Sequence, residues 1–338
     1  MRAPERARGL DFMLGLILLL QTLTIAVSGP ATSPEYLPLR VAEAEGYFTR
    51  EGLAVTLKTT RSEVGAAEAL AQTQVDLAAT SLEAILRFGT RAVTQAPRLV
   101  FGLTAAPPVA LLLSAPLDGT IRSVGQLVGL RVGVAAPGDP AHTWLTALLA
   151  RARVSIAQVE MVSLGDRGLV SALEKGDVQA GVVEEPAASR LVAEHHAVVL
   201  GDLRTPGAVE HALGVPTLNA GVFMRADRKV ADGDLAALAR ALIDAERLLD
   251  TASAERLASR LPRASVGVPE EFERRIEATR NLYLPEGVAS AIQVRESIAI
   301  IRVHMPLSST LKVPRPEDLI AGPALKRPAT RPSPRGTK

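Results

Sequence analysis

Short apolar runs alternate with amphipathic stretches along most of the chain. The stretches between the runs, such as 63–72 and 140–153, carry apolar residues at helical spacing. Strands that alternate with helices of about ten residues form parallel βαβ units, so an α/β fold is predicted. The runs with β-type patterning are 22–28, 53–59, 76–80, 98–104, 109–114, 130–135, 159–164, 180–184, 197–200 and 218–224.

The predicted units fall into two sets, and the chain crosses between the sets twice. The first crossing is expected near 104–109 and the second near 205–217. Each set would form one lobe with a central, mostly parallel sheet flanked by helices, and the carboxyl ends of the strands would border a ligand cleft between the lobes. We expect lobe 1 to begin with 22–104 and lobe 2 to span 105–210. Residues 211–323 would return to lobe 1 with one strand and the C-terminal helices.

The two ends of the chain differ in charge from the body. Three arginines among the first eight residues precede an apolar run at 12–20, which is the pattern of an export signal. Residues 1–21 are therefore expected to be either a cleaved signal or a retained membrane anchor. The proline-rich tail, 324–338, carries five bases and no acid and is expected to be disordered. Without the first eleven residues and this tail, 30 basic and 34 acidic residues remain, so nucleic-acid binding is not expected.

The residue inventory excludes several chemistries. The 338 residues include no cysteine, which rules out disulfides, thiolate metal sites, a cysteine nucleophile and a lipidated N-terminal cysteine. His195 and His196 are adjacent rather than spaced to share a metal on a helix, so we interpret them as surface residues. The sequence has no phosphate-binding loop, nucleophile elbow or paired-carboxylate motif. We therefore expect no enzyme, no cofactor and no metal site.

Three stretches carry a family resemblance. They are the opening Pro-Glu-Tyr-Leu-Pro-Leu-Arg-Val of 34–57, the segment Ser-Val-Gly-Gln-Leu-Val-Gly-Leu of 123–134, and the helix, Gly-Asp turn, strand and Glu-Pro pair of 170–186. Together they resemble the solute-binding proteins of ABC transporters, in the class that takes sulfonates, taurine, nitrate and thiamine precursors. The resemblance implies a two-lobed fold like that of the type 2 periplasmic-binding proteins.

The resemblance also implies a function. The protein would capture a small organic solute by hinge closure and deliver it to an ABC permease driven by its ATPase subunit. It would be a monomer in the periplasm or another extracytoplasmic space, either free or tethered to the inner membrane through its N-terminal segment. The alternative is a biosynthetic enzyme on the same fold, acting in thiamine pyrimidine or quinone precursor synthesis.

The segment 22–28 has two interpretations. Ala26-Val-Ser28 satisfies the small-x-small rule for signal cleavage. In the family that the chain resembles, a strand immediately precedes the Pro-rich opening and its end contributes to the ligand cleft. Cleavage after Ser28 would remove that strand. We therefore favour the strand and expect cleavage near Gln21 or no cleavage at all.

Candidate ligand residues in the first lobe follow the ends of its predicted strands. Thr32 and Ser33 lie at a helix start, where hydroxyls and exposed amides either cap the helix or hold an anionic group. Arg61 is the only base in these turns, and it either faces the ligand or is solvated. The remaining candidates in this lobe are Tyr36, Thr80 and Ser81.

The second lobe offers a similar succession of strand, glycine turn and helix start. Gly138 allows close approach of the backbone, and His142 and Thr143 lie in the first helical turn, within reach of the cleft. Tyr36 and Trp144 lie in the first turns of two facing helices. They either sandwich a planar ligand or pack their helices against the sheets.

Glu184 and Glu185 end a predicted strand just before a proline. Because side chains alternate along a strand, one of them should face the cleft and the other should face away. A buried carboxylate requires a donor, so the inward one should bind an amine, a hydroxyl or an arginine. These two carboxylates suit a sulfonate or nitrate poorly, and the identity of the ligand stays open.

Overall fold

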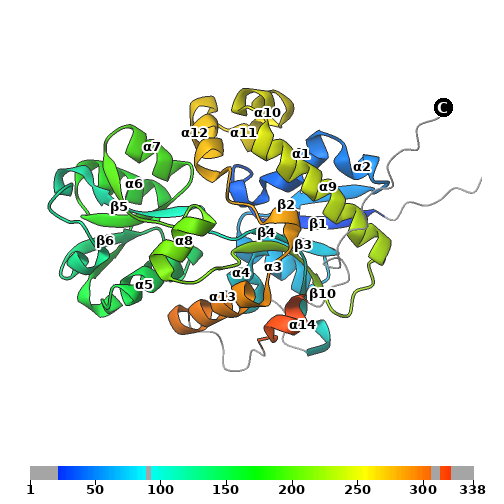
Figure 1. The fold of residues 1–338 in the computed structure, drawn as a ribbon, viewed down its shortest axis with the longest axis horizontal. Coiled ribbons are helices and arrows are strands. Elements are labelled where there is room, and N and C mark those ends of the chain that lie inside the picture. The colour runs from blue at the N-terminus through cyan, green and yellow to red at the C-terminus, as the bar shows by residue number, and fades with distance from the viewer. Residues whose placement is uncertain (1–21, 89–92, 306–312, 321–338) are drawn as a thin grey trace, which may run out of the picture.

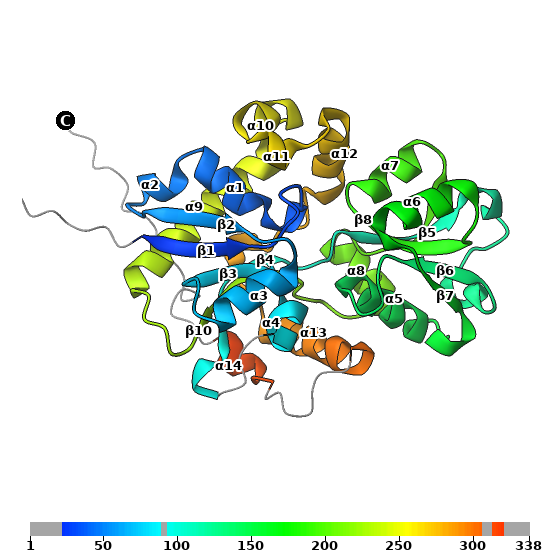
Figure 2. The same ribbon diagram turned by 180° about the vertical axis from the view of Figure 1, so that it is seen from behind.

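The computed structural model describes residues 22–88, 93–305 and 313–320, arranged as two lobes around two separate five-stranded sheets (Figures 1 and 2). The strand order is β2-β1-β3-β10-β4 in the first sheet and β7-β6-β8-β5-β9 in the second. The predicted two-lobed α/β architecture is confirmed. The signal or anchor expected at 1–21 and the tail expected at 324–338 lie outside the described residues.

In the first sheet one strand runs against the other four. Strand β1 pairs in parallel with both β2 and β3, whereas β10 inserts between β3 and β4 and is antiparallel to each. The return strand expected late in the chain is therefore present. The strands are β1 (Leu23–Val27), β2 (Val55–Thr59), β3 (Leu77–Ser81), β4 (Pro97–Thr104) and β10 (Ala220–Arg225).

The strand expected at 22–28 is present as β1, while the site of signal cleavage stays a prediction. It lies between β2 and β3, and its residues Ile25 and Val27 are fully buried. The loop after β1 leads into the first helices of the lobe. Cleavage after Ser28 would thus remove an interior strand from the first sheet.

The second sheet repeats this plan. Strand β6 pairs in parallel with β7 and β8, and β5 is antiparallel to its neighbours β8 and β9. Both sheets are therefore mostly parallel with one reversed strand. The strands are β5 (Val109–Ser114), β6 (Arg131–Val134), β7 (Glu160–Ser163), β8 (Ala180–Glu184) and β9 (Ala197–Asp202).

Helices cover both faces of each sheet, and buried residues form a core on either side of each. The first lobe begins with α1 (Leu37–Ala44), α2 (Tyr47–Arg50), α3 (Glu63–Ala71) and α4 (Leu82–Phe88). The second has α5 (Pro140–Arg151), α6 (Gly165–Lys175), α7 (Ala187–Ala193) and α8 (Pro206–Leu213). The C-terminal part has α9 (Asp232–Thr251), α10 (Ala254–Arg260), α11 (Arg263–Val266), α12 (Pro269–Thr279), α13 (Ala291–His304) and α14 (Pro316–Ile320). Short 3-10 turns are η1 (Pro34–Tyr36), η2 (Val93–Gln95), η3 (Ala115–Leu117), η4 (Val124–Leu127), η5 (Ile156–Gln158) and η6 (Pro285–Gly287).

Two features differ from the sequence expectations. The stretch 34–50, whose helical spacing predicts a single helix, is divided, because Gly46 adopts a left-handed conformation (φ +68°) between α1 and α2. The second crossing also contains a helix, α8, which Thr205 caps through its side chain. Val209 and Leu213 of α8 pack in the core of the second lobe. The boundary expected after residue 210 therefore falls inside a helix that packs on the second sheet.

The C-terminal helices touch both lobes. Helix α12 packs against α7, and α13 packs against α5. An ion pair between Arg190 of α7 and Glu271 of α12 adds to the first of these contacts at 3.8 Å. Within the described ranges, no helix combines the length and apolar character needed to cross a membrane.

Candidate functional site

A cleft of about 550 Å³ lies between the lobes, and both lobes line it. In the first lobe its wall comes from the loop after β1, the start of α3 after β2, and the start of α4 after β3. In the second lobe it comes from the turn after β6, the start of α6 after β7, and the end of β8. All these segments follow the carboxyl ends of parallel strands, where ligands bind in open α/β sheets.

The structure places six of the twelve residues singled out in the sequence on the cleft wall and six away from it. Those on the wall are Ser33, Tyr36, Arg61, Gly138, Trp144 and Glu184. Those outside it are Thr32, Thr80, Ser81, His142, Thr143 and Glu185. Several of the second group support the wall from behind.

A hydrogen-bond network in the first lobe centres on Glu63, a residue that the sequence analysis did not select. The Tyr36 hydroxyl donates to Glu63 Oε1 at 2.7 Å, and the Ser81 hydroxyl donates to Glu63 Oε2 at 2.6 Å. The Thr80 hydroxyl donates to the Glu63 backbone carbonyl at 3.0 Å. Thr80 and Ser81 therefore hold Glu63 in place from behind the wall. Burial raises the pKa of Glu63, and the two hydroxyl donors oppose that rise.

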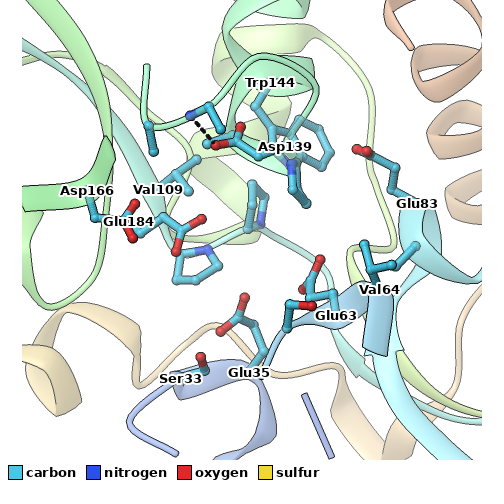
Figure 3. Close-up of a pocket in the computed structure, with 18 of the residues that line it drawn as sticks. Ser33, Glu35, Glu63, Val64, Glu83, Val109, Asp139, Trp144, Asp166 and Glu184 are labelled. Carbon is cyan, nitrogen blue, oxygen red and sulfur yellow. Dashed lines mark hydrogen bonds between the residues drawn. The ribbon is translucent and has the colours of Figure 1, made fainter. Parts of the chain in front are cut away.

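Ser33 and Thr32 do not act as helix caps with their side chains. Ser33 precedes η1 without a side-chain capping hydrogen bond, and its hydroxyl lies on the cleft wall (Figure 3). Thr32 is directed elsewhere: its methyl group lies beside Gly267, near the end of α11. The turn after β1 therefore contributes one hydroxyl to the cleft, not two.

The corresponding turn of the second lobe is held by its own side chains. Asp139 caps α5 by accepting a hydrogen bond from the His142 amide at 2.8 Å, and it also accepts one from the Ala136 amide at 3.0 Å. His142 Nδ1 accepts a hydrogen bond from the Gly138 amide at 2.9 Å. Gly138 itself has φ +83°, a conformation that favours glycine. His142 thus shapes the turn instead of lining the cleft.

The two adjacent glutamates at the end of β8 point in opposite directions, as strand geometry requires. Glu185 is only 7% exposed and forms an ion pair with Arg204 at 3.0 Å and a hydrogen bond from the Ser189 hydroxyl at 2.7 Å. Glu184 is open to solvent in the cleft. Because protein surrounds the cleft on both sides, desolvation and the nearby Glu63 raise the pKa of Glu184 to about 8.

Acidic side chains dominate the cleft wall (Figure 3). They come from both lobes: Glu35, Glu63, Glu83, Asp139, Asp166 and Glu184. Burial raises the pKa of Glu35 well above its ordinary value, and it also raises the pKa of Asp139. Only Glu184 was among the twelve residues selected from the sequence. Of the other five, Asp139 is the N-cap of α5, and the remaining four lie in the first turn of a helix that follows a strand, which is the positional signal that could have identified them.

The two bases on the wall have different surroundings. Arg61 is exposed at the rim. Arg87 of α4 pairs with Glu83 at 3.3 Å and donates to the Gly138 carbonyl at 2.8 Å, so it links the two lobes. Burial raises the pKa of Glu83 to about 7, and the Arg87 guanidinium opposes that rise.

Tyr36 and Trp144 both reach the cleft but are largely buried. Tyr36 is 2% exposed and packs in the core of the first lobe, and Trp144 is 6% exposed and packs in the core of the second. Both side chains therefore pack their helices against the sheets, while the stacking of a planar ligand between them stays a prediction. Among the described side chains, no group of three or more His, Asp or Glu is arranged to hold a metal ion.

Comparison with solved structures identifies the fold. A protein of Bordetella bronchiseptica RB50 superposes with a TM-score of 0.72 at 23% identity, over 90% of this chain and 96% of that one. The periplasmic aliphatic sulphonate binding protein SsuA of Escherichia coli gives 0.69 at 15% identity, over 88% and 91% of the two chains. The periplasmic nitrate-binding protein NrtA of Synechocystis PCC 6803 gives 0.52 at 15%, over 80% and 73%. At these identities the likeness establishes the fold alone.

Sequence comparison identifies the family. No curated protein matches the chain. The family model described as NMT1/THI5 like matches residues 33–210, which is more than half of the chain. That match covers the cleft-wall residues from Ser33 to Glu184 and nearly all of the second lobe. The chain therefore belongs to the NMT1/THI5-like family and has the two-lobed fold of the periplasmic binding proteins.

Proposed function

We propose that the protein is the extracytoplasmic solute-binding component of an ABC importer. It captures one small organic solute between its lobes and delivers it to a permease with an ATPase subunit. The solute classes implied by the resemblance are sulfonates, taurine, nitrate and thiamine pyrimidine precursors. The observation that carries the proposal is the cleft of about 550 Å³, with walls built from both lobes.

The connections between the lobes support a hinge mechanism. The chain passes from β4 to β5 through residues 105–108 and returns through residues 214–219. Pro107 and Pro108 of the first connection also line the cleft. A solute bound in the cleft would contact both walls and the connection, and would favour the closed arrangement of the lobes. Two of the similar structures are those of a sulphonate-binding and a nitrate-binding periplasmic protein, which supports this mechanism.

The chain contains a built-in reporter for the test. Trp144 is the only tryptophan in the sequence, and it lies on the cleft wall. We expect a bound solute to change the fluorescence of Trp144. It should also reduce the radius of gyration of the protein, as measured by small-angle X-ray scattering. Replacing Trp144 by Phe should abolish the fluorescence change while calorimetry still detects binding.

The same experiment separates a binding protein from the alternative enzyme. A binding protein releases the solute chemically unchanged, which mass spectrometry of the released fraction can check. Recovery of a converted product, with turnover, would favour a biosynthetic enzyme on this fold. If the small-molecule fraction of a bacterial extract produced neither a fluorescence change nor compaction, the proposal would be contradicted.

A further inference from the structure

The protein's own carboxylates occupy the helix starts that border the cleft. Helix N-termini are the places in this kind of fold where an anionic ligand would be bound by free amides. Asp139 already accepts two backbone amides at the start of α5. The first turns of the other elements that reach the cleft also carry acids, namely Glu35 in η1, Glu63 in α3, Glu83 in α4 and Asp166 in α6. An anion placed at any of these starts would meet a carboxylate.

Glu35, which is one of these acids, and Glu184 at the end of β8 are both directed into the cleft (Figure 3). Glu35 is only 8% exposed, and within the described part of the chain its own backbone amide is the one group that donates to it. No described group donates a hydrogen bond to Glu184 on the opposite wall. The two carboxyls are close enough that Glu184 contributes to the raised pKa of Glu35. A buried carboxyl with so few donors is costly, so a ligand that donates hydrogen bonds to Glu35 is favoured here.

The bases on the wall do not balance these acids. Arg87 is already engaged with Glu83 and with the Gly138 carbonyl. Arg61 lies exposed at the rim. The centre of the cleft is therefore bordered by Glu35, Glu63 and Glu184 without a basic side chain between them. A positive charge at this point would favour the ionised form of all three carboxyls and so oppose the rise in their pKa values, whereas a negative charge would raise those pKa values further.

Resting on the solute-binding function proposed above, we propose that the solute is an organic cation whose ammonium or amidinium group is held by Glu35, Glu63 and Glu184. The ligand class then differs from that of the sulphonate- and nitrate-binding neighbours, although the fold is shared. An N–H-bearing cation supplies the donors that Glu35 and Glu184 lack. Glu63 is oriented for the same group by the hydroxyls of Tyr36 and Ser81.

The test is a capture experiment with the full chain at pH 7.5. The protein is incubated with the small-molecule fraction of a bacterial extract, washed, and its bound solutes are identified by mass spectrometry. We expect the retained solute to carry a positively charged nitrogen. Titration of that compound should show at least about tenfold weaker binding to Glu184→Gln and to Glu35→Gln, because each variant replaces a carboxyl group that can ionise beside the cation with an amide that cannot.

The control is Glu160→Gln on β7, which removes one negative charge far from the cleft wall. The Glu160 side chain is 65% exposed and makes only a surface ion pair with Arg131. The affinity of the Glu160→Gln variant for the captured compound should stay within about twofold of that of the wild type. Since Glu184 is open to solvent, its variant is expected to fold even if Glu35→Gln does not.

The outcomes distinguish the two proposals. Retention of nitrate, of a neutral compound or of any sulfonate, zwitterionic taurine included, would overturn the inference and leave the solute-binding function standing. Retention of a cation whose affinity is unaffected by Glu184→Gln and Glu35→Gln would also overturn it. Retention of no compound at all would contradict the solute-binding function itself.

Discussion

The Arg87 guanidinium reaches across the cleft and donates a hydrogen bond to the Gly138 carbonyl at 2.8 Å. Arg87 belongs to α4 of the first lobe, and Gly138 belongs to the turn before α5 of the second. The same guanidinium pairs with Glu83 at 3.3 Å on its own helix. The bond therefore connects the cleft wall of one lobe to that of the other and should favour the closed arrangement.

Replacing Arg87 by Met should weaken solute capture. The variant removes the bond across the cleft and leaves Glu83 without its arginine. We expect the binding free energy of the solute to weaken by about 1.5 kcal/mol, which is roughly tenfold in affinity. Small-angle scattering in the presence of the captured compound should show a larger radius of gyration than the wild type. Arg247→Met, at an exposed arginine of α9 that is not part of the cleft wall, is the control, and equal effects of both changes would contradict a specific role for the bond.

Replacing Tyr36 by Phe should destabilise the first lobe modestly. The change leaves Glu63 with one hydroxyl donor, Ser81, and should lower the free energy of unfolding by about 1 kcal/mol in urea denaturation. Tyr47→Phe, at a half-buried tyrosine that stacks against Arg50, serves as the matched control and should have a smaller effect. An unchanged stability in Tyr36→Phe would show that the hydroxyl does not support Glu63.

The ion pair between Glu185 and Arg204 should matter far more for stability than a surface pair. The Glu185 side chain is fully buried and that of Arg204 is 15% exposed. Arg204→Met would leave a buried carboxylate without its charge partner. It should lower the free energy of unfolding by about 3–5 kcal/mol. The double variant Glu185→Gln with Arg204→Met should cost less than the two single changes together, which a double-mutant cycle in urea would measure.

Glu184 should titrate far above the usual range of a carboxyl group. Desolvation in the cleft, Glu63 and two aspartates raise its pKa to about 8. Carbon-13 NMR of the glutamate carboxyls should show a resonance with a midpoint near pH 8 that is missing in Glu184→Gln. A resonance assigned to Glu184 with a midpoint near pH 4 to 5 would contradict the packing of the cleft described above.

Glu246 on α9 should make the protein less stable as the pH rises. It is only 9% exposed, and its Oε1 atom has no hydrogen-bond partner among the described residues. Burial raises its folded-state pKa well above the unfolded value of about 4.3, so the folded state holds the proton more tightly. The stability that this provides is complete below the unfolded pKa and is lost as the pH rises through the folded pKa.

The variant Glu246→Gln tests this relation, because its amide does not ionise. We expect the difference in unfolding free energy between the variant and the wild type to shift in favour of the variant from pH 4 to pH 9. Urea denaturation at several pH values measures it. If the unfolding free energies of the two proteins changed with pH in the same way, the pKa of Glu246 would not differ between the folded and unfolded states.

The sequence by itself determined the strands, the two-lobed fold and the return strand. The alternation of apolar residues and the glycines and prolines that end each strand are local signals, and they identified β1 as a strand although it directly follows an export-type segment. Alternation also predicted that Glu184 and Glu185 face opposite ways. The short helix α8 was missed because Val209 and Leu213 give only a weak helical pattern, and the helix lies inside the segment expected to cross between the lobes.

The acidic character of the cleft was decided by the tertiary structure. Nothing near Glu63 in the sequence distinguishes it from any acid in a first helical turn. It meets Tyr36 and Ser81 only because β1 pairs in parallel with both β2 and β3, which brings three separate loops to one edge of the sheet. Likewise Glu184, not Glu185, faces the cleft because Arg204, 19 residues away from Glu185, holds the latter on the other side. Local pattern thus determined the elements, and the pairing of distant strands determined which side chains share one site.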